Sequence, residues 1–61
     1  MSTNVITQGS RAVVISEQDG TVRARLFVNA QDGIQHADAT LSAWKGKTIK
    51  GAKQWAAKKL A

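Results

Sequence analysis

The chain has 61 residues, no cysteine, one histidine and a formal net charge of +5 at pH 7. A chain of this length forms one domain with a thin core and buries only about 60% of its unfolded surface. Without cysteine, a disulfide framework is excluded and a structural zinc site is essentially excluded. The amino terminus lacks the basic start and apolar core of a signal peptide, and no apolar run could span a membrane, so we expect a cytoplasmic protein.

The charge is unevenly distributed along the chain. No acidic residue follows Asp38, whereas six of the nine basic residues do: Lys45, Lys47, Lys50, Lys53, Lys58 and Lys59. The remaining basic residues are Arg11, Arg23 and Arg25. A field of one sign on a small domain attracts polyanions, above all nucleic acid, and secondarily an anionic membrane or an acidic protein.

The first ten residues are polar and end in Gly9-Ser10, which predicts a flexible arm over residues 1–10 that lays Val5 and Ile6 along a sheet edge at most. Residues 11–61 are expected to form a single domain. Residues 11–17 are rich in β-branched side chains, residues 21–29 alternate between apolar and polar, and Asp19-Gly20 between them is typical of a two-residue turn. This pattern predicts a β-hairpin.

The triplet Gln-Asp-Gly occurs at 18–20 and again at 31–33, so we expect a second tight turn and a third strand over residues 34–41. Two-residue turns would place Val13 opposite Leu26 and Leu26 opposite Ala39. They would also pair Ile15 with Ala24 and Ala24 with Leu41. The apolar face would then collect Val13, Ile15, Val22, Ala24, Leu26, Val28, Ala37, Ala39 and Leu41. An alternative interpretation makes residues 37–44 a short helix, because Ala37, Leu41 and Trp44 also have helical spacing.

The last third of the chain has the pattern of an amphipathic helix. Thr48 is suited to cap its start, and Gly46 allows the chain to turn before it. Ile49, Ala52, Ala56 and Leu60 share one stripe, with Trp55 on its flank as a lid on the core edge. The expected fold is therefore α+β, a three-stranded antiparallel β-meander packed on one C-terminal α-helix.

Two features of this helix break local rules. Lys47 and Lys50 lie at the positive end of the helix dipole, and Gly51 costs about 1 kcal/mol relative to alanine inside a helix. Such violations often mark function, and lysines beside unpaired amides at a helix start form a phosphate site. The alternative is a solvated face that keeps a small protein soluble.

The other face of the predicted sheet would carry Val14, Ser16, Arg23, Arg25, Phe27, Asn29, His36, Asp38 and Thr40. Two arginines beside an aromatic residue on an open sheet are suited to bind base edges and phosphates. The alternative is ordinary surface, with Arg25 paired to Asp38 and Phe27 forming a small exposed patch with Val14.

Catalysis is not expected from this sequence. His36, Asp38 and Ser42 lie near one another in the chain, but a single sheet with one helix offers little concavity for nucleophilic catalysis. The carboxylates form no acid/base pair, and the glycines around the lysines lack phosphate-loop spacing. We expect neither an enzyme nor a bound cofactor.

Residues 46–60, Gly-Lys-Thr-Ile-Lys-Gly-Ala-Lys-Gln-Trp-Ala-Ala-Lys-Lys-Leu, resemble the last helix of double-stranded-RNA-binding domains. The resemblance implies that Lys47, Lys50 and Lys53 grip phosphates across a groove. Residues 1–10 have no counterpart of that family's first helix, and its groove-binding loop is replaced by the Asp19-Gly20 turn.

The order of three strands and a helix is similar to the N-terminal DNA-binding domains of phage and transposon integrases and of some plant transcription factors. In those domains the sheet enters the major groove. This resemblance in architecture implies that Arg23, Arg25 and Asn29 face the bases while the helix supports the sheet.

These observations predict a small basic protein that binds double-stranded nucleic acid, DNA in preference to RNA, largely through phosphates. The expected contact residues are Arg23, Arg25, Asn29, Lys45, Lys47, Lys50 and Lys53. The alternative is a small phage- or plasmid-type modulator that binds a host protein through Phe27, Val14 or an open strand edge. The expected oligomeric state is a monomer or a weak homodimer.

Overall fold

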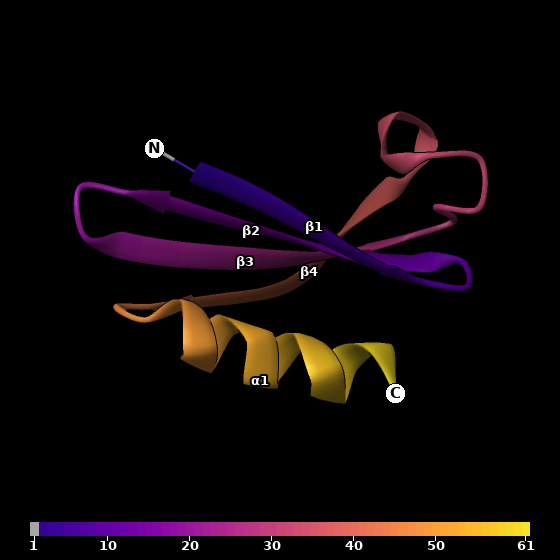
Figure 1. Ribbon diagram of the computed structural model, residues 1–61. Coiled ribbons are helices and arrows are strands. Elements are labelled where there is room, and N and C mark those ends of the chain that lie inside the picture. Colours follow the sequence, from indigo (N-terminus) through magenta and orange to yellow (C-terminus); the bar gives the residue numbers. More distant parts are fainter. Residues whose placement is uncertain (1) are drawn as a thin grey trace.

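A computed structural model describes residues 2–61 of the chain, and within these residues a four-stranded antiparallel sheet packs on one α-helix. The elements are β1 (Ser2–Gln8), β2 (Arg11–Gln18), β3 (Thr21–Val28), a 3₁₀ turn η1 (Ile34–His36), β4 (Asp38–Gly46) and α1 (Ile49–Leu60). The strands follow one another across the sheet in chain order. Figure 1 shows the strongly twisted sheet, with α1 on one face and the β3–β4 connection rising at one end on the other side.

The first strand replaces the predicted flexible arm. Ser2–Gln8 pairs with β2 so that Val5 lies opposite Val14 and Ile6 opposite Val13; Met1 lies outside the described residues. Gly9 takes a φ of +61° and turns the chain between the two strands. The prediction of three strands is therefore wrong by one, because Gly9-Ser10 makes a hairpin turn.

The second hairpin has the predicted register. Val13 lies opposite Leu26, and Ile15 lies opposite Ala24. Asp19 and Gly20 both have positive φ, +54° and +78°, as a two-residue turn of the type that matches strand twist requires. The prediction for this half of the meander is confirmed.

The β3–β4 connection is longer than the predicted tight turn. The chain leaves β3 at Asn29, which has a φ of +59°, and reaches β4 only at Asp38. Gly33, with a φ of +108°, precedes the η1 turn instead of closing a hairpin. The alternative of a helix over residues 37–44 is also wrong, since these residues, apart from Ala37, belong to β4.

The pairing of β4 differs from the predicted register. Phe27 lies opposite Ala39, where Leu26 was expected, and Ala24 lies opposite Trp44 rather than Leu41. A bulge separates these two segments of the ladder. At the bulge, the Thr40 hydroxyl donates to the Leu26 carbonyl oxygen at 2.9 Å and accepts from the Ser42 amide at 3.1 Å. The side chain thus supplies hydrogen bonds where the regular ladder is interrupted.

The slipped register reverses the faces expected for this strand. Positions Thr40, Ser42, Trp44 and Gly46 are half-buried, whereas Asp38, Ala39, Leu41, Ala43 and Lys45 are exposed. Leu41, expected in the core, is fully exposed. A shift of one residue exchanges the two faces of a strand, because side chains alternate with a period of two.

The helix is built as its sequence predicts. The Thr48 hydroxyl accepts a hydrogen bond from the Gly51 amide at 3.1 Å, and Ala52, Ala56 and Leu60 are buried. They pack on a core of Val13, Ile15, Val22 and Ala24, bordered by the partly buried Ile6, Leu26, Trp44, Ile49 and Trp55. At the far end, an Arg11 guanidinium nitrogen donates to the Lys59 carbonyl oxygen at 3.3 Å. This bond supplies a donor to the carboxyl end of the helix.

Trp44 explains the glycine inside the helix. A Cβ atom at Gly51 would lie 2.9 Å from Trp44 Cζ2, and a Cβ atom at Gly46 would collide with the same indole ring. The ring therefore occupies a slot between two glycines, one at the end of β4 and one in the first turn of α1. The unfavourable helix propensity of Gly51 thus has a packing reason.

In residues 2–61 no helix has the length and apolarity needed to cross a membrane.

Candidate nucleic-acid interface

The face of the sheet that points away from α1, called the outer face below, carries three of the nine basic residues, Arg23, Arg25 and Lys45. Its strand positions follow from the register and the alternation along each strand, and are Thr3, Val5, Thr7, Ala12, Val14, Ser16, Gln18, Thr21, Arg23, Arg25, Phe27, Ala39, Leu41, Ala43 and Lys45. Arg23, Arg25 and Phe27 occupy alternate positions of β3, so they stand in one column about 7 Å apart. The sequence prediction for these three residues is confirmed as far as their shared face is concerned.

A pair of like charges lies at one end of this column. Arg23 is directly opposite Lys45 in the β3–β4 ladder, and both side chains are exposed. Like charges at directly opposite positions destabilise a sheet. Arg25 follows two residues along the same strand, opposite Ala43 on one side and Val14 on the other. Three cations therefore share a small area of the outer face.

The strand positions of the outer face hold no carboxylate within residues 2–61. Glu17 lies opposite the buried Val22, and Asp38 lies opposite Val28, so both belong to the other set of alternate positions. The alternative in which Arg25 pairs with Asp38 does not hold, because the two residues lie on opposite faces of the sheet; Asp38 Oδ2 instead accepts from Asn29 Nδ2 at 2.7 Å. The cations therefore outnumber the anions on this face, although the β2–β3 turn brings Asp19 close to Ser16 and Arg23 at its edge.

A shallow open depression of about 540 Å³ lies among these cations. It is lined by Val14, Ser16, Arg23, Ala24, Arg25, Phe27, Ala43, Trp44 and Lys45. Its apolar lining residues include Val14, Phe27 and Ala43 of the outer face. The arrangement is an apolar floor bordered by cationic side chains.

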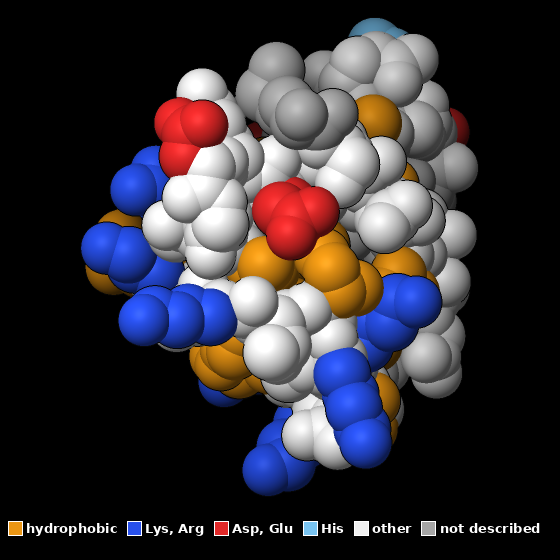
Figure 2. All heavy atoms as spheres, turned by 60° about the vertical axis from the view of Figure 1, so that its left-hand side comes forward, with side chains coloured by type: hydrophobic (Ala, Val, Ile, Leu, Met, Phe, Trp, Pro, Cys, Tyr) orange, Lys and Arg blue, Asp and Glu red, His pale blue; other side chains and the backbone are white. Residues whose placement is uncertain are grey.

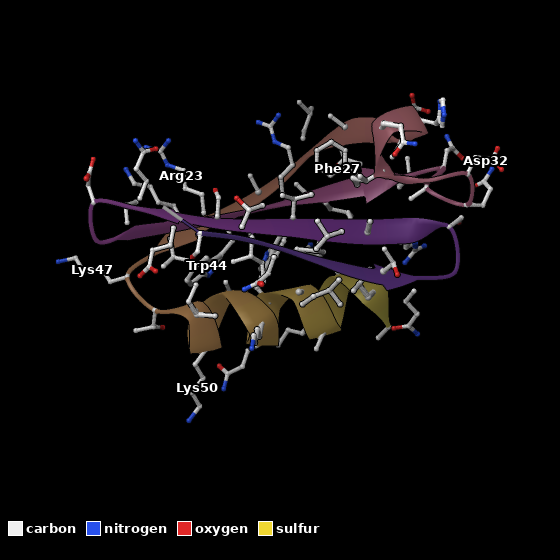
Figure 3. The ribbon with its side chains drawn as sticks, turned by 45° about the horizontal axis from the view of Figure 1, so that its top comes forward. Arg23, Phe27, Asp32, Trp44, Lys47 and Lys50 are labelled. Carbon is white, nitrogen blue, oxygen red and sulfur yellow. The ribbon has the colours of Figure 1, made fainter. Side chains whose placement is uncertain are left out.

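Figure 2 looks onto the end of the domain where the β2–β3 turn and the start of α1 lie. Lysine and arginine side chains are spread over this end, and acidic side chains lie between them. Figure 3 shows Arg23 and Phe27 on the outer face, Lys47 at the end of the domain and Lys50 directed away from the sheet. Lys53 is also exposed on α1. The predicted contact residues therefore form two groups, one on the outer face and one along the end and the helix.

Asn29 lies apart from both groups. It follows the end of β3 in the long connection, at the other end of the β3 column from Arg23, and its amide is hydrogen bonded to Asp38. Its left-handed backbone is one that asparagine adopts more readily than most residues. The structure thus gives Asn29 a role in shaping the connection, while its role in contacting bases stays a prediction.

The sequence predicts Lys45 as a contact residue without assigning it to a face, and it predicts no part for Ala43. Both positions belong to the outer face because β4 continues to Gly46. The alternation from Ala43 to Lys45 was available as a signal, but its face depends on the bulge at Thr40. His36 is exposed in η1 and Ser42 is half-buried in β4. Among residues 2–61 no three side chains of histidine, aspartate or glutamate gather where a metal ion could bind.

No family model matches the chain, and searches of curated proteins and of solved structures find no match either. The resemblances to double-stranded-RNA-binding domains and to integrase DNA-binding domains therefore stay predictions.

Proposed function

We propose that the protein binds double-stranded nucleic acid, DNA in preference to RNA, through phosphate contacts with little sequence specificity. The observation that carries the proposal is the exposed Arg23–Lys45 pair, which sets two like charges directly opposite each other on a face whose strand positions hold no carboxylate within residues 2–61. A phosphate between the two side chains would turn this repulsion into two attractive contacts. Arg25 adds a third cation in the same column.

The shape of the outer face favours DNA over RNA. The major groove of B-form DNA is about 12 Å wide and admits a two-stranded β-ribbon. β3 and β4 are such a ribbon at one edge of the sheet, and they carry all three cations of the outer face. The deep and narrow major groove of A-form RNA does not admit side chains in this way.

Further lysines extend the positive surface around the end of the domain. Lys47 follows β4 directly, and Lys50 lies in the first turn of α1. Near the β3–β4 ribbon, Lys47 is placed to reach the backbone flanking the groove. Lys50 and Lys53 project from the helix, so we assign them a smaller part than the outer face.

A fully exposed leucine favours a second candidate function. Leu41 projects from the edge strand β4, and Val5 on the opposite edge strand is about half exposed. Exposed apolar side chains on strand edges are typical of surfaces that pair with another chain. The protein would then act as a small modulator that binds a host protein.

The test is fluorescence anisotropy with labelled duplex DNA and duplex RNA of about 20 base pairs at several salt concentrations. Three to five phosphate contacts predict a log–log salt slope of about −3 to −4.5 for DNA. Arg23→Ala and Lys45→Ala should each weaken binding and reduce the slope by about 1. Lys58→Ala removes the same charge at the carboxyl end of α1 and serves as the matched control, with little expected change.

Two results would contradict this proposal. If Lys58→Ala and Lys45→Ala reduced the affinity for duplex DNA equally, net charge rather than the outer face would determine binding. Absence of binding to either duplex at low salt would favour the host-protein alternative. A partner that remains bound after nuclease treatment and at high salt, and is lost on Leu41→Ser, would support that alternative.

A further inference from the structure

The apolar floor of the depression is not explained by phosphate contacts. Cations alone suffice to hold a nucleic-acid backbone, yet the space between Arg25 and its neighbours is floored by Val14, Phe27 and Ala43. Phe27 is half-buried, and Figure 3 shows its side chain on the outer face, with Arg23 farther along the sheet. The depression therefore combines a flat aromatic residue with a positive border.

This combination fits a ligand that is anionic at one part and flat and apolar at another. A nucleotide with an unpaired base has both properties, whereas bases inside a continuous duplex keep their faces stacked on each other. A depression of about 540 Å³ is large enough for one base, because pockets of about 300 to 1,000 Å³ hold drug-sized molecules. The absence of carboxylates on the outer-face strand positions of residues 2–61 agrees with an anionic ligand.

The order of residues along β3 gives this ligand a direction. Arg23, opposite Lys45, lies at one end of the column, Arg25 lies in the middle, and Phe27 lies about 14 Å from Arg23. A strand that leaves a duplex at the charged end would bring its first unpaired bases to the aromatic end. The column thus matches a junction between paired and unpaired nucleic acid.

We propose that the depression holds an unpaired nucleobase stacked on Phe27, with Arg25 between this base and the phosphates bound by Arg23 and Lys45 at the other end of the column. The inference rests on the proposed function and deepens it, since the preferred ligand becomes a duplex with an unpaired extension. Base stacking on an aromatic side chain corresponds to a gain in affinity of at least about fivefold per base. The gain is less sensitive to salt than the phosphate contacts are.

The experiment compares three labelled DNA ligands by anisotropy at one salt concentration. They are a blunt duplex of about 20 base pairs, the same duplex with a short thymidine overhang, and the same duplex with an abasic overhang of equal length. The abasic overhang keeps the added phosphates and lacks the bases. The wild-type protein should bind the thymidine overhang at least about fivefold more tightly than the abasic one.

Variants at Phe27 identify the stacking residue. Phe27→Leu keeps an apolar side chain without an aromatic face, so the preference for thymidine over abasic overhangs should disappear while the blunt duplex binds as before. Phe27→Tyr keeps the aromatic face and should keep the preference. Circular dichroism of each variant establishes that the sheet is folded before its affinities are compared.

Each outcome distinguishes the inference from the function on which it rests. Equal affinity for thymidine and abasic overhangs, or a preference that survives Phe27→Leu, would overturn the stacking site and leave duplex binding intact. Absence of binding to all three ligands would overturn both. If the protein bound none of the three DNA ligands but bound an acidic peptide with an aromatic side chain, the depression would be assigned to a protein partner.

Discussion

The substitution Gly51→Ala should destabilise this protein, although it would stabilise an ordinary helix. In an exposed helix interior, alanine is favoured over glycine by about 1 kcal/mol. Here the new Cβ would lie 2.9 Å from Trp44 Cζ2, 3.1 Å from Trp44 Cη2 and 3.1 Å from Thr48 Oγ1. The same indole also lies against Gly46, so the ring cannot retreat freely from Gly51.

The magnitude follows from two opposing contributions. Forcing an extra methyl group into a packed site costs about 1 to 3 kcal/mol, which offsets or exceeds the gain in helix propensity. We expect a net loss of about 1 kcal/mol in the free energy of unfolding. For a domain of this size, that loss lowers Tm by about 4 to 8 °C.

A double-mutant cycle followed by urea unfolding and far-ultraviolet circular dichroism tests the cause. In a Trp44→Phe background the shorter ring leaves room, so Gly51→Ala should become stabilising by about 1 kcal/mol. The resulting coupling of about 2 kcal/mol is in the range measured for residues in contact. If Gly51→Ala raised the stability of the otherwise native protein by about 1 kcal/mol, the argument from the indole slot would be refuted.

Three further substitutions test the bulge, the helix cap and the charged pair. Thr40→Val leaves both backbone partners of the hydroxyl without their bonds, so urea unfolding should show a loss of about 1 to 3 kcal/mol; a loss below about 0.5 kcal/mol would contradict the role given to this side chain. Thr48→Ala removes the cap at the start of α1 and should cost about 1 kcal/mol in the same assay, whereas Thr48→Ser should preserve stability. Lys45→Glu replaces a like-charge pair by an opposite-charge pair with Arg23, so stability should rise by about 0.2 to 1 kcal/mol while anisotropy shows weaker binding to duplex DNA. Unchanged binding by that variant would show that the pair takes no part in the interface.

The parts of the fold that depend on local chemistry could be predicted from the sequence. Asp19 and Gly20 tolerate positive φ, and this turn determines the register of Val13 opposite Leu26. The helix followed from its cap and its apolar stripe. The first strand was missed because its residues are polar and mostly exposed, so the periodic apolar signal of a strand is weak there.

The same triplet gave a wrong prediction at its second occurrence. Gln-Asp-Gly forms a tight turn at 18–20, but at 31–33 the strand has already ended at the left-handed Asn29. A turn signal fixes register only where both flanking strands reach it. The resulting slip placed Ala39 opposite Phe27 instead of Leu26, and one residue of slip was enough to exchange the faces of β4.

In the candidate site, too, the residues placed by a local pattern could be predicted, and those placed by the register between strands could not. Arg23, Arg25 and Phe27 share a face because alternation within β3 does not depend on its neighbour, so their grouping could be predicted. The place of Lys45 depends on the β3–β4 register, which no local pattern determines. The sequence therefore predicted the β3 side of the depression, and it named Lys45 as a contact residue without placing it opposite Arg23.

The bulge in the β3–β4 ladder, which the sequence did not predict, also brings Lys45 opposite Arg23. If the ladder continued regularly from Phe27 opposite Ala39, Arg25 would face Leu41 and Arg23 would face Ala43. The bulge accommodates two additional residues of β4, so that Ala43 faces Arg25 and Lys45 faces Arg23. A small side chain thereby replaces leucine beside Arg25, which opens the depression, and a second cation joins Arg23. Because the Thr40 hydroxyl bridges this bulge, Thr40→Val should weaken DNA binding together with stability, whereas Thr48→Ala should affect stability alone.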